Sequence, residues 1–410
     1  MSKGRLFALP LVFLVLAACD TGGSTARPSP SVTASAQAWP TGGPLAVYDG
    51  GPPNAQTHTV WVVGFNNAGR PNVTAKVLAS VTVAKRTDIP FKCFDCFATD
   101  PPYVSTSKTH VYVLDGNSTV SMLAPDGSVK KVTSIPATDI TRAAFAVNPD
   151  NSLIAVGLMD FRSQTTKLYV EKLGGGGRVD LFSAPGPFFY WPVRWRNGKI
   201  VLATGPNTES FANPYHARGY ALIDPIAGAQ PVALGNGDCI PSGTVTAAGT
   251  ACIVRPGTQC LEDLVANAVS PYYYNSCLRS LSWSGTETTF LMPYNQDTST
   301  LKVNYAALSP DGQEVITDQL GKVFAPLSPI HGGNNFVGIN LVYGLKTPAR
   351  PCMGFINNNL LSWTFVNPDG STDVRLMGAT FEGSTDIAPG VPSSPVNGDL
   401  VGTVPDEFDG

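Results

Sequence analysis

The sequence predicts an all-β fold, and three observations lead to it. Only 14% of the 410 residues are charged, while glycine (41) and proline (35) are plentiful, a composition that suits short strands joined by tight turns and disfavours long helices. A strand–turn–strand motif recurs along the chain, and a second type of hairpin lies between its copies. Two hairpins in each period give four strands, and a repeat of four short antiparallel strands predicts a β-propeller.

The first element along the chain is an export signal. Lys3 and Arg5 precede an apolar run, Leu6–Ala18, that is too short to span a bilayer as a helix. The small residues Ala17 and Ala18 stand directly before Cys19. This pattern resembles the precursors of bacterial lipoproteins, and the resemblance implies that residues 1–18 are removed and that Cys19 receives a diacylglyceryl thioether. A secretory signal that is cut without lipidation is the alternative.

Residues 19–43 are expected to form a flexible linker that holds the folded domain off the membrane. They are mostly Thr, Gly, Ser, Pro and Ala and carry too little apolar surface to offset the entropy of ordering. The formal net charge of the chain is −3, without a basic block. Nucleic acid is therefore excluded as a partner, because phosphate binding needs clustered Lys and Arg.

The first type of hairpin has two clear copies, Asn148-Pro149-Asp150-Asn151 and Ser309-Pro310-Asp311-Gly312, each between apolar runs. Proline presets φ at the second turn position, the Asn or Ser side chain caps the first, and the final Asn or Gly tolerates a left-handed backbone. Comparable turns are expected at four further places: near Lys108, Arg196-Asn197-Gly198, Ala248-Gly249 and Pro348.

The second type of hairpin is expected in three ranges: Ser121–Val129, Tyr220–Gly228 and Trp363–Ser371. One blade is then expected over residues 140–184, with strands near 142–147, 153–158, 166–173 and 178–183.

Counting the periods predicts a propeller over residues 44–383, most consistent with seven blades, with six or eight open. The range 44–92 supplies the seventh unit. The first and last strands of the chain are candidates to share one blade and so close the ring. Residues 384–410 are expected to form a loosely ordered tail.

The chain resembles bacterial exported propellers of the TolB or WD40-like type, whose blades carry Ser-Pro-Asp-Gly after the first strand. Ser309-Pro310-Asp311-Gly312 matches that motif, and Asn148-Pro149-Asp150-Asn151 is a degenerate copy. The resemblance implies the fold and a location in the cell envelope. It does not imply a ligand, because that family includes binding and scaffold proteins as well as domains attached to hydrolases.

Cysteines other than Cys19 are candidates for disulfides outside the cytoplasm. Cys239 with Cys252, and Cys260 with Cys277, are close enough in sequence to close local loops, although spacing alone does not fix pairing. Cys93 and Cys96 have C-x-x-C spacing. A disulfide is the favoured interpretation there; redox chemistry, a metal site and a bond from one of them to Cys352 stay open.

Catalytic motifs are missing from the sequence. It contains no G-x-S-x-G, His-Glu-x-x-His, Walker or G-x-G-x-x-G motif, and His331-Gly332-Gly333 lacks the elbow that would make it an oxyanion loop. No cofactor or metal is expected. Candidate carboxylates for glycoside chemistry are Asp160, Asp224, Asp238, Glu262 and Asp263. Turn positions explain four others better: Asp126, Asp150, Asp311 and Asp369.

Aromatic clusters are the better functional candidates. One comprises Phe188, Phe189, Tyr190 and Trp191, with Trp195 and Arg196 nearby; the other comprises Tyr272, Tyr273 and Tyr274, inside the segment bracketed by Cys260 and Cys277. Either cluster is able to contact a protein or a sugar. The alternative for the first cluster is that it fills the space between adjacent blades.

These features favour a lipid-anchored extracytoplasmic binding or assembly module of the cell envelope, whose partner is a protein. The alternative hypothesis is a carbohydrate-binding or carbohydrate-active propeller that uses the mouth of the channel. A purely structural propeller that pairs with another lipoprotein is the third hypothesis.

Overall fold

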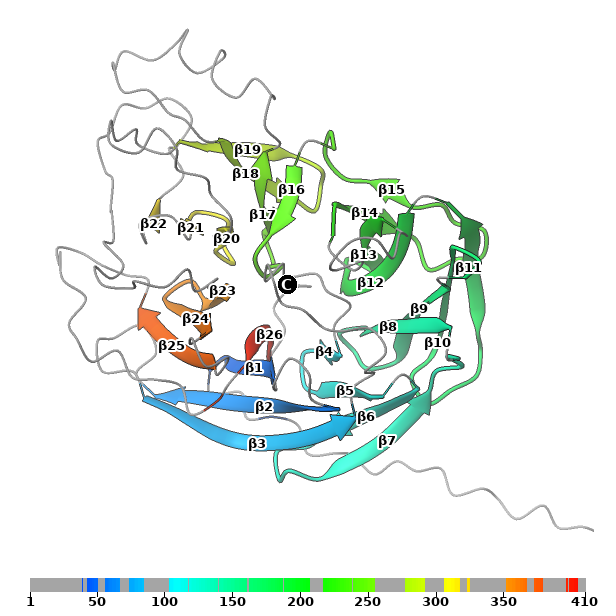
Figure 1. The fold of residues 1–410 in the computed structure, drawn as a ribbon, viewed down its shortest axis with the longest axis horizontal. Helices are drawn as coiled ribbons and strands as arrows, with labels where there is room; N and C mark the ends of the chain where they lie inside the picture. Colours follow the sequence, from blue (N-terminus) through cyan, green and yellow to red (C-terminus); the bar gives the residue numbers. More distant parts are fainter. Residues whose placement is uncertain are drawn as a thin grey trace, which may run out of the picture. The chain divides into compact units, whose positions relative to one another are not determined.

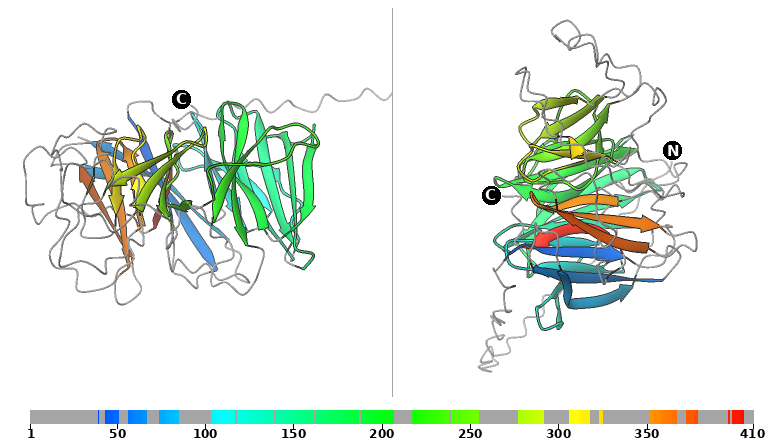
Figure 2. Two further views of the ribbon diagram at one scale, coloured as in Figure 1. Left: turned by 90° about the horizontal axis from the view of Figure 1, so that it is seen from above. Right: turned by 90° about the vertical axis from the view of Figure 1, so that its left-hand side faces the viewer.

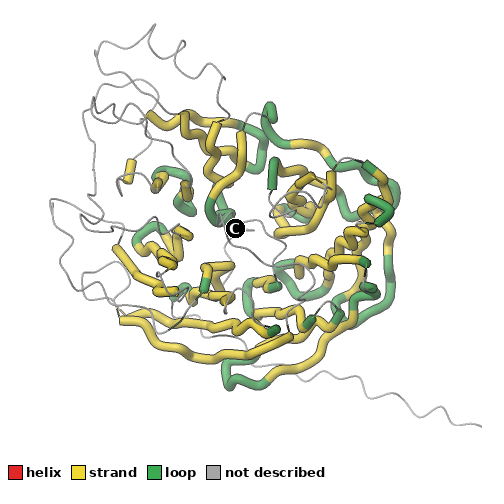
Figure 3. The backbone as a smooth tube through the Cα atoms, in the orientation of Figure 1, coloured by secondary structure: helices red, strands yellow, loops and turns green. Residues whose placement is uncertain are grey.

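The fold is described here from a computed structural model. The described residues are 39, 43–50, 56–66, 74–84, 103–116, 118–138, 140–160, 162–186, 188–206, 217–237, 239–254, 277–291, 306–317, 323–324, 352–366, 372–378, 396 and 398–404. All the regular structure in these ranges is β-strand (Figure 3). They include no helix long and apolar enough to cross a bilayer.

Antiparallel sheets are arranged around a common centre, as in a β-propeller (Figure 1). From the innermost strand outward, the first is β26 (Asp399–Val404), β1 (Leu45–Gly50), β2 (Thr57–Asn66) and β3 (Thr74–Ala84). The second is β4 (Val104–Thr106), β5 (Val111–Asp115), β6 (Thr119–Leu123) and β7 (Val129–Ser134). The third is β8 (Thr141–Val147), β9 (Leu153–Asp160), β10 (Thr165–Lys172) and β11 (Val179–Pro185).

The remaining sheets continue in chain order around the centre. The fourth is β12 (Phe188–Arg196), β13 (Lys199–Pro206), β14 (Gly219–Ile223) and β15 (Val232–Ala233). The fifth is β16 (Cys239–Ser242), β17 (Gly249–Val254), β18 (Cys277–Ser282) and β19 (Glu287–Leu291). Two three-stranded sheets follow: β20 (Ala306–Leu308), β21 (Val315–Thr317) and β22 (Val323–Phe324), then β23 (Cys352–Asn357), β24 (Leu360–Val366) and β25 (Thr372–Gly378).

The all-β propeller that the sequence predicts is therefore present, with a difference in detail. Five of the described sheets have four strands, and the last two have three, so the expectation of seven four-stranded blades is met only in part. The blade expected over residues 140–184 has all four of its strands within about two residues of the predicted positions.

Each sheet contacts the next, and these contacts close the ring. Innermost strands meet directly from β26 to β4, β8 and β12, and again from β20 to β23 and back to β26. The fifth sheet joins its neighbours through contacts of β16 with β14 and of β17 with β20. Every sheet thereby buries its faces against the sheets beside it, as propeller blades must.

The pairing of β26 with β1 joins the two ends of the folded unit. Leu45 pairs with Val404 and Asp49 with Asp399, so the last strand is the innermost strand of the first sheet. The expectation that first and last strands share one blade is confirmed. The expectation of a loosely ordered tail over residues 384–410 is wrong for Asp399–Val404, because this segment pairs with β1 and its side chains Leu400 and Val404 are buried in two apolar clusters of the core.

The turns of the first hairpin type have the expected conformation. Asn148 Oδ1 accepts hydrogen bonds from the backbone N–H groups of Ser152 (2.9 Å) and Leu153 (2.8 Å), and Ser309 Oγ accepts one from Glu314 (2.9 Å). Asn151 (φ 63°) and Gly312 (φ 73°) have the predicted left-handed backbone. The turn expected near Pro348 lies outside the described residues, and the sheet of β23 turns at Asn358–Asn359.

The folded unit begins before the predicted boundary at residue 44. Trp39 is only 3% exposed and belongs to the same apolar cluster as Leu45, Val104 and Val111. The compact unit spans Gln37–Gly410. The expected linker, residues 19–43, therefore contains one large apolar side chain that the core takes up.

One of the two local disulfides that the spacing suggested is present. Cys239 in β16 is bonded to Cys252 in β17, with the Cα atoms 5.0 Å apart. The other two candidate pairs, Cys260–Cys277 and Cys93–Cys96, stay predictions, because Cys260, Cys93 and Cys96 lie outside the described residues. Cys277 is the first residue of β18.

Deleting residues 397–410 removes β26 and should destroy the cooperative unfolding of the domain. The deletion leaves β1 without a partner and exposes the core side chains that Leu400 and Val404 cover. A deletion of residues 405–410 keeps β26 and serves as the matched control, which should melt like the full chain. Thermal unfolding followed by circular dichroism measures both. A cooperative transition at the same temperature in the longer deletion would contradict ring closure by β26.

Candidate functional site

The two faces of the ring carry different connections. The turns between the first and second strands of neighbouring sheets contact one another: Asn151 donates to Thr109 Oγ1 (2.9 Å), Thr246 donates to the carbonyl of Ser309 (3.3 Å), and Asp311 N–H donates to Asn358 (3.0 Å). We call the side that holds these turns the turn face and the opposite side, where the innermost strands begin, the loop face. Figure 2 shows the strands running between the two faces.

Three long connections border the loop face. Because neighbouring strands are antiparallel, β17 ends there and β18 begins there, so residues 255–276 are bracketed by strand ends at that face. The same holds for residues 85–102, between β3 and Tyr103, and for residues 207–216, between β13 and β14. Tyr272, Tyr273 and Tyr274 are in the first of these ranges, outside the described residues.

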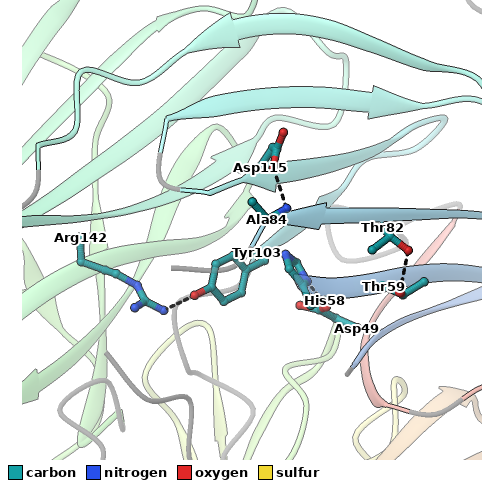
Figure 4. A network of polar contacts seen from close by, with 8 residues as sticks. All are labelled: Asp49, His58, Thr59, Thr82, Ala84, Tyr103, Asp115 and Arg142. Carbon is teal, nitrogen blue, oxygen red and sulfur yellow. Dashed lines mark hydrogen bonds and ion pairs between the residues drawn. The ribbon is translucent and has the colours of Figure 1, made fainter. Parts of the chain in front are cut away.

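Four side chains form a polar network near the loop face (Figure 4). Asp49 lies near the end of β1 and His58 near the start of β2, and the two contact each other through Asp49 Oδ1 and His58 Nδ1. His58 is 4% exposed, and its Nε2 atom is buried without a hydrogen-bond partner in the described structure. When Asp49 accepts the Nδ1 hydrogen, Nε2 carries the lone pair and is able to accept a hydrogen bond.

Tyr103 connects this pair to the third sheet. Its ring lies against the imidazole of His58, with centroids 4.5 Å apart. Its hydroxyl accepts a hydrogen bond of 2.6 Å from Nη2 of Arg142, at the start of β8, and the guanidinium carbon is 5.2 Å from the ring centroid. Tyr103 and Arg142 are both buried. The network thus ties the first, second and third sheets together beside the β1–β26 seam.

The described part of the network holds no metal-ligand cluster. Within the described ranges, no three His, Cys, Asp or Glu side chains come together as metal ligands do. His58 and Asp49 have the geometry of a base and its orienting carboxylate, and among the described residues the His58 ring contacts Asp49 and the ring of Tyr103. The arrangement holds three sheets together and offers one buried acceptor.

Side chains of the second and fourth sheets reach β26 near the centre of the ring. Arg194, on β12, donates a hydrogen bond of 2.7 Å from Nη2 to the carbonyl of Val401 on β26, in the first sheet. A Cβ placed on Gly402 would lie 2.8 Å from Thr106 Oγ1 and 2.9 Å from Arg194 Nη2. At this level the centre is therefore packed, and Gly402 is the residue that lets the guanidinium approach.

The sequence-predicted carboxylates are accounted for by local structure where they are described. Asp160 accepts hydrogen bonds from the N–H groups of Arg162 (2.8 Å) and Ser163 (3.0 Å). These bonds, chiefly that from Ser163, lower its pKa, which is the opposite of what a general acid needs. Asp224 pairs with Lys199 (3.0 Å) on the surface. Asp238, Glu262 and Asp263 lie outside the described residues.

The aspartates that were assigned to turns are found in them. Asp126 accepts from Ser128 N–H (2.9 Å), Asp150 from Ser152 (2.9 Å) and Asp311 from Gln313 (3.0 Å). Serine side-chain hydrogen bonds are the main cause of the lowered pKa of both Asp126 and Asp150. Asp369 lies outside the described residues.

The first aromatic cluster is mostly core. Phe189 and Trp191 have no exposed surface, and Trp195 is 4% exposed, its indole N–H donating to the carbonyl of Ala146 (2.9 Å) on β8. Because β12 presents these side chains to the neighbouring sheets, packing accounts for them and no binding role is needed. Tyr190 and Arg196 are half-buried, while Phe188 is 46% exposed at the loop-face end of β12.

Sequence reasoning did not identify the polar network or Glu314. His58, Tyr103 and Arg142 are far apart in the sequence and carry no motif, so no local signal could have linked them. Glu314 stands two residues after the turn motif Ser309–Gly312, and its Oε2 atom is buried without a hydrogen-bond partner in the described structure. Burial raises the pKa of its carboxyl, and the nearby Asp311 carboxylate raises it further.

No protein-family model and no curated protein matches the chain. Among solved structures it is similar to the β-propeller domain of the Trilobed protease from Pyrococcus furiosus, with 10% identity, 83% of this chain and 84% of the other covered, and a TM-score of 0.36. It is also similar to a chain of the Mitotic Checkpoint Complex, with 14% identity, 70% of this chain and 83% of the other covered, and a TM-score of 0.34. A third similar structure is prolyl oligopeptidase B from Galerina marginata, with 8% identity, 82% of this chain and 49% of the other covered, and a TM-score of 0.38. These likenesses assign no activity.

Replacing Glu314 with Gln should stabilise the protein at pH 7 and leave it unchanged near pH 3. A carboxyl whose pKa is raised by folding opposes the folded state once it ionises, so its cost appears as pH rises above the unfolded value of about 4.3. Chemical denaturation at both pH values measures the difference.

Asp126→Asn is the control of opposite sign for Glu314→Gln. The pKa of Asp126 is lowered, so its contribution is present at pH 7 and is lost as pH falls below the unfolded value. This variant should be less stable than the parent chain at pH 7 and equal to it at low pH. A Glu314→Gln variant that is destabilised at pH 7 would show that the carboxylate has a favourable partner.

Proposed function

We propose that this protein is a lipid-anchored extracytoplasmic β-propeller, of the bacterial lipoprotein and TolB-like kind, that binds a protein partner in the cell envelope. The β-propeller fold is the observed part of this proposal. The anchor, the compartment and the partner are its inferred parts, and each is supported by separate residues.

The anchor and the compartment are supported by cysteines. Leu16-Ala17-Ala18-Cys19 stands at the end of the apolar signal, in the order that lipoprotein signal peptidases cut. The bond between Cys239 and Cys252 fits an oxidising compartment, since structural disulfides are rare in the cytoplasm. Both features favour the outer side of the cytoplasmic membrane or the cell surface.

A binding role rests on the asymmetry of the ring. Tight turns connect neighbouring sheets on the turn face, while three long connections, residues 85–102, 207–216 and 255–276, are bracketed by strand ends on the loop face. Recognition residues are commonly carried on loops that a rigid scaffold positions. The contact surface that we propose is therefore the segment 253–277 with Tyr272, Tyr273 and Tyr274, together with the exposed Phe188.

Catalysis and sugar binding in the channel are less well supported. The described candidate carboxylates serve turns or a surface ion pair. Arg194 and Thr106 lie against β26 near the centre of the ring, which narrows the room for a sugar at that level. A glycan ligand is therefore the alternative hypothesis, and the partner experiment described below tests it.

Replacing Cys19 with Ser should abolish lipidation and release the protein from membranes. The thioether forms on the cysteine sulfur, so a serine leaves the chain without an acyl anchor. Detergent phase partitioning and mass spectrometry of the mature N-terminus measure the change. Cys352→Ser, which leaves the signal intact, is the control. Equal membrane association of the Cys19→Ser variant would refute the lipid anchor.

Replacing Tyr272, Tyr273 and Tyr274 together with Ala should reduce partner recovery by roughly tenfold or more, since aromatic anchors dominate binding energy at interfaces. The assay is crosslinking in intact cells followed by purification of the full chain and mass spectrometry. A variant with Ile226→Ala and Val232→Ala, which are exposed on the outer part of the fourth sheet, is the control. Unchanged recovery would place the partner elsewhere, and glycan-array binding without a protein partner would favour the carbohydrate hypothesis.

A further inference from the structure

Trp39 fixes the place where the N-terminal segment joins the ring. Its side chain is 3% exposed in the cluster that holds Val104 and Val111, and its backbone N–H donates to the carbonyl of Thr109 at 3.4 Å. Thr109 belongs to the turn between β4 and β5, on the turn face, where Asn151 of the next sheet also contacts it. Trp39 therefore lies at the turn face.

The first strand gives independent support for this place of exit. Leu45 pairs with Val404, at the end of β26, whereas Gly50 pairs with Thr59, near the start of β2 and beside His58 of the loop-face network. β1 thus runs from the turn face to the loop face. Even without Trp39, the chain would join the ring at the turn face.

The linker is short relative to the size of the ring. Nineteen residues, Asp20–Ala38, separate Cys19 from Trp39. A flexible chain of this length has a root-mean-square extent of about 24 Å. A strand of seven or eight residues, the length of β8, β9 and β10, spans about 25 Å from one face to the other. The average extent of the linker is therefore about the thickness of the ring, so the face at which the chain joins the ring lies, on average, nearer to the bilayer than the opposite face.

We infer that the anchored domain keeps its turn face toward the membrane and presents the loop face outward. This inference rests on the lipid anchor proposed above. It places the loop face, with the exposed Phe188, on the side from which a protein partner would approach.

Two exposed cationic residues provide a matched pair of labelling positions. Lys108 lies in the β4–β5 turn on the turn face, and Arg162 lies in the β9–β10 turn on the loop face. Each would be replaced by p-azidophenylalanine, which is coupled to a donor dye without using the native cysteines. Both substitutions remove one positive charge from an exposed turn.

The experiment measures energy transfer from each donor to an acceptor lipid in vesicles. A hexahistidine tag replaces Cys19 in the otherwise complete mature chain and binds nickel-chelating lipid, so the result does not depend on lipidation. The donor at position 108 should transfer at least about twofold more efficiently than the donor at position 162, because the two faces differ in height by about 25 Å. Equal transfer, or greater transfer from position 162, would overturn the inference.

A second anchoring site tests whether the geometry of the ring decides the result. A hexahistidine tag after Gly410 also follows a strand, β26, that ends at the turn face, so it should reproduce the same order of transfer. A tag inserted beside Ser163, in the loop-face turn, should reverse the order. If the protein with the inserted tag does not fold, the two terminal tags still test the inference. Greater energy transfer from position 162 than from position 108 with either terminal tag would contradict it. Loss of lipidation in the Cys19→Ser test would refute the anchor alone.

Discussion

The pairing of β26 with β1 is the interaction on which the other features of this fold depend. A sheet of a propeller buries its faces only if a neighbour stands on each side, and a linear series of sheets would leave two ends exposed. The chain solves this by using its last strand as the innermost strand of its first sheet. The seam also brings Val401 and Gly402 to the centre, where Arg194 and Thr106 meet them.

The closed ring has two different faces. Short capped turns, such as those of Asn148 and Ser309, lie on one face, and three long segments border the other. The polar network of Asp49, His58, Tyr103 and Arg142 lies near the second face and connects three sheets beside the seam. Rigidity beneath the loops lowers the entropy lost when they bind a partner, which is consistent with the proposed binding role.

Predictions from the sequence succeeded where the signal was local. The turn at Asn148–Asn151 and the strands around it depend on neighbouring residues, and the Cys239–Cys252 bond closes a separation of only 13 residues. Predictions were less complete where packing decided the outcome. Trp39 was counted as linker and Asp399–Val404 as tail, since each is flanked by polar or small residues and becomes apolar core only through distant partners.

By itself, the sequence determined the all-β class and the hairpin period, because composition and turn residues act over a few neighbouring positions. Only the tertiary structure decided which strand closes the ring, which aromatic side chains are core and which groups surround His58. Those outcomes depend on contacts between residues tens to hundreds of positions apart, such as Tyr103 with Arg142 and Arg194 with Val401. No local pattern encodes such contacts, since they exist only when all the sheets have packed around one centre.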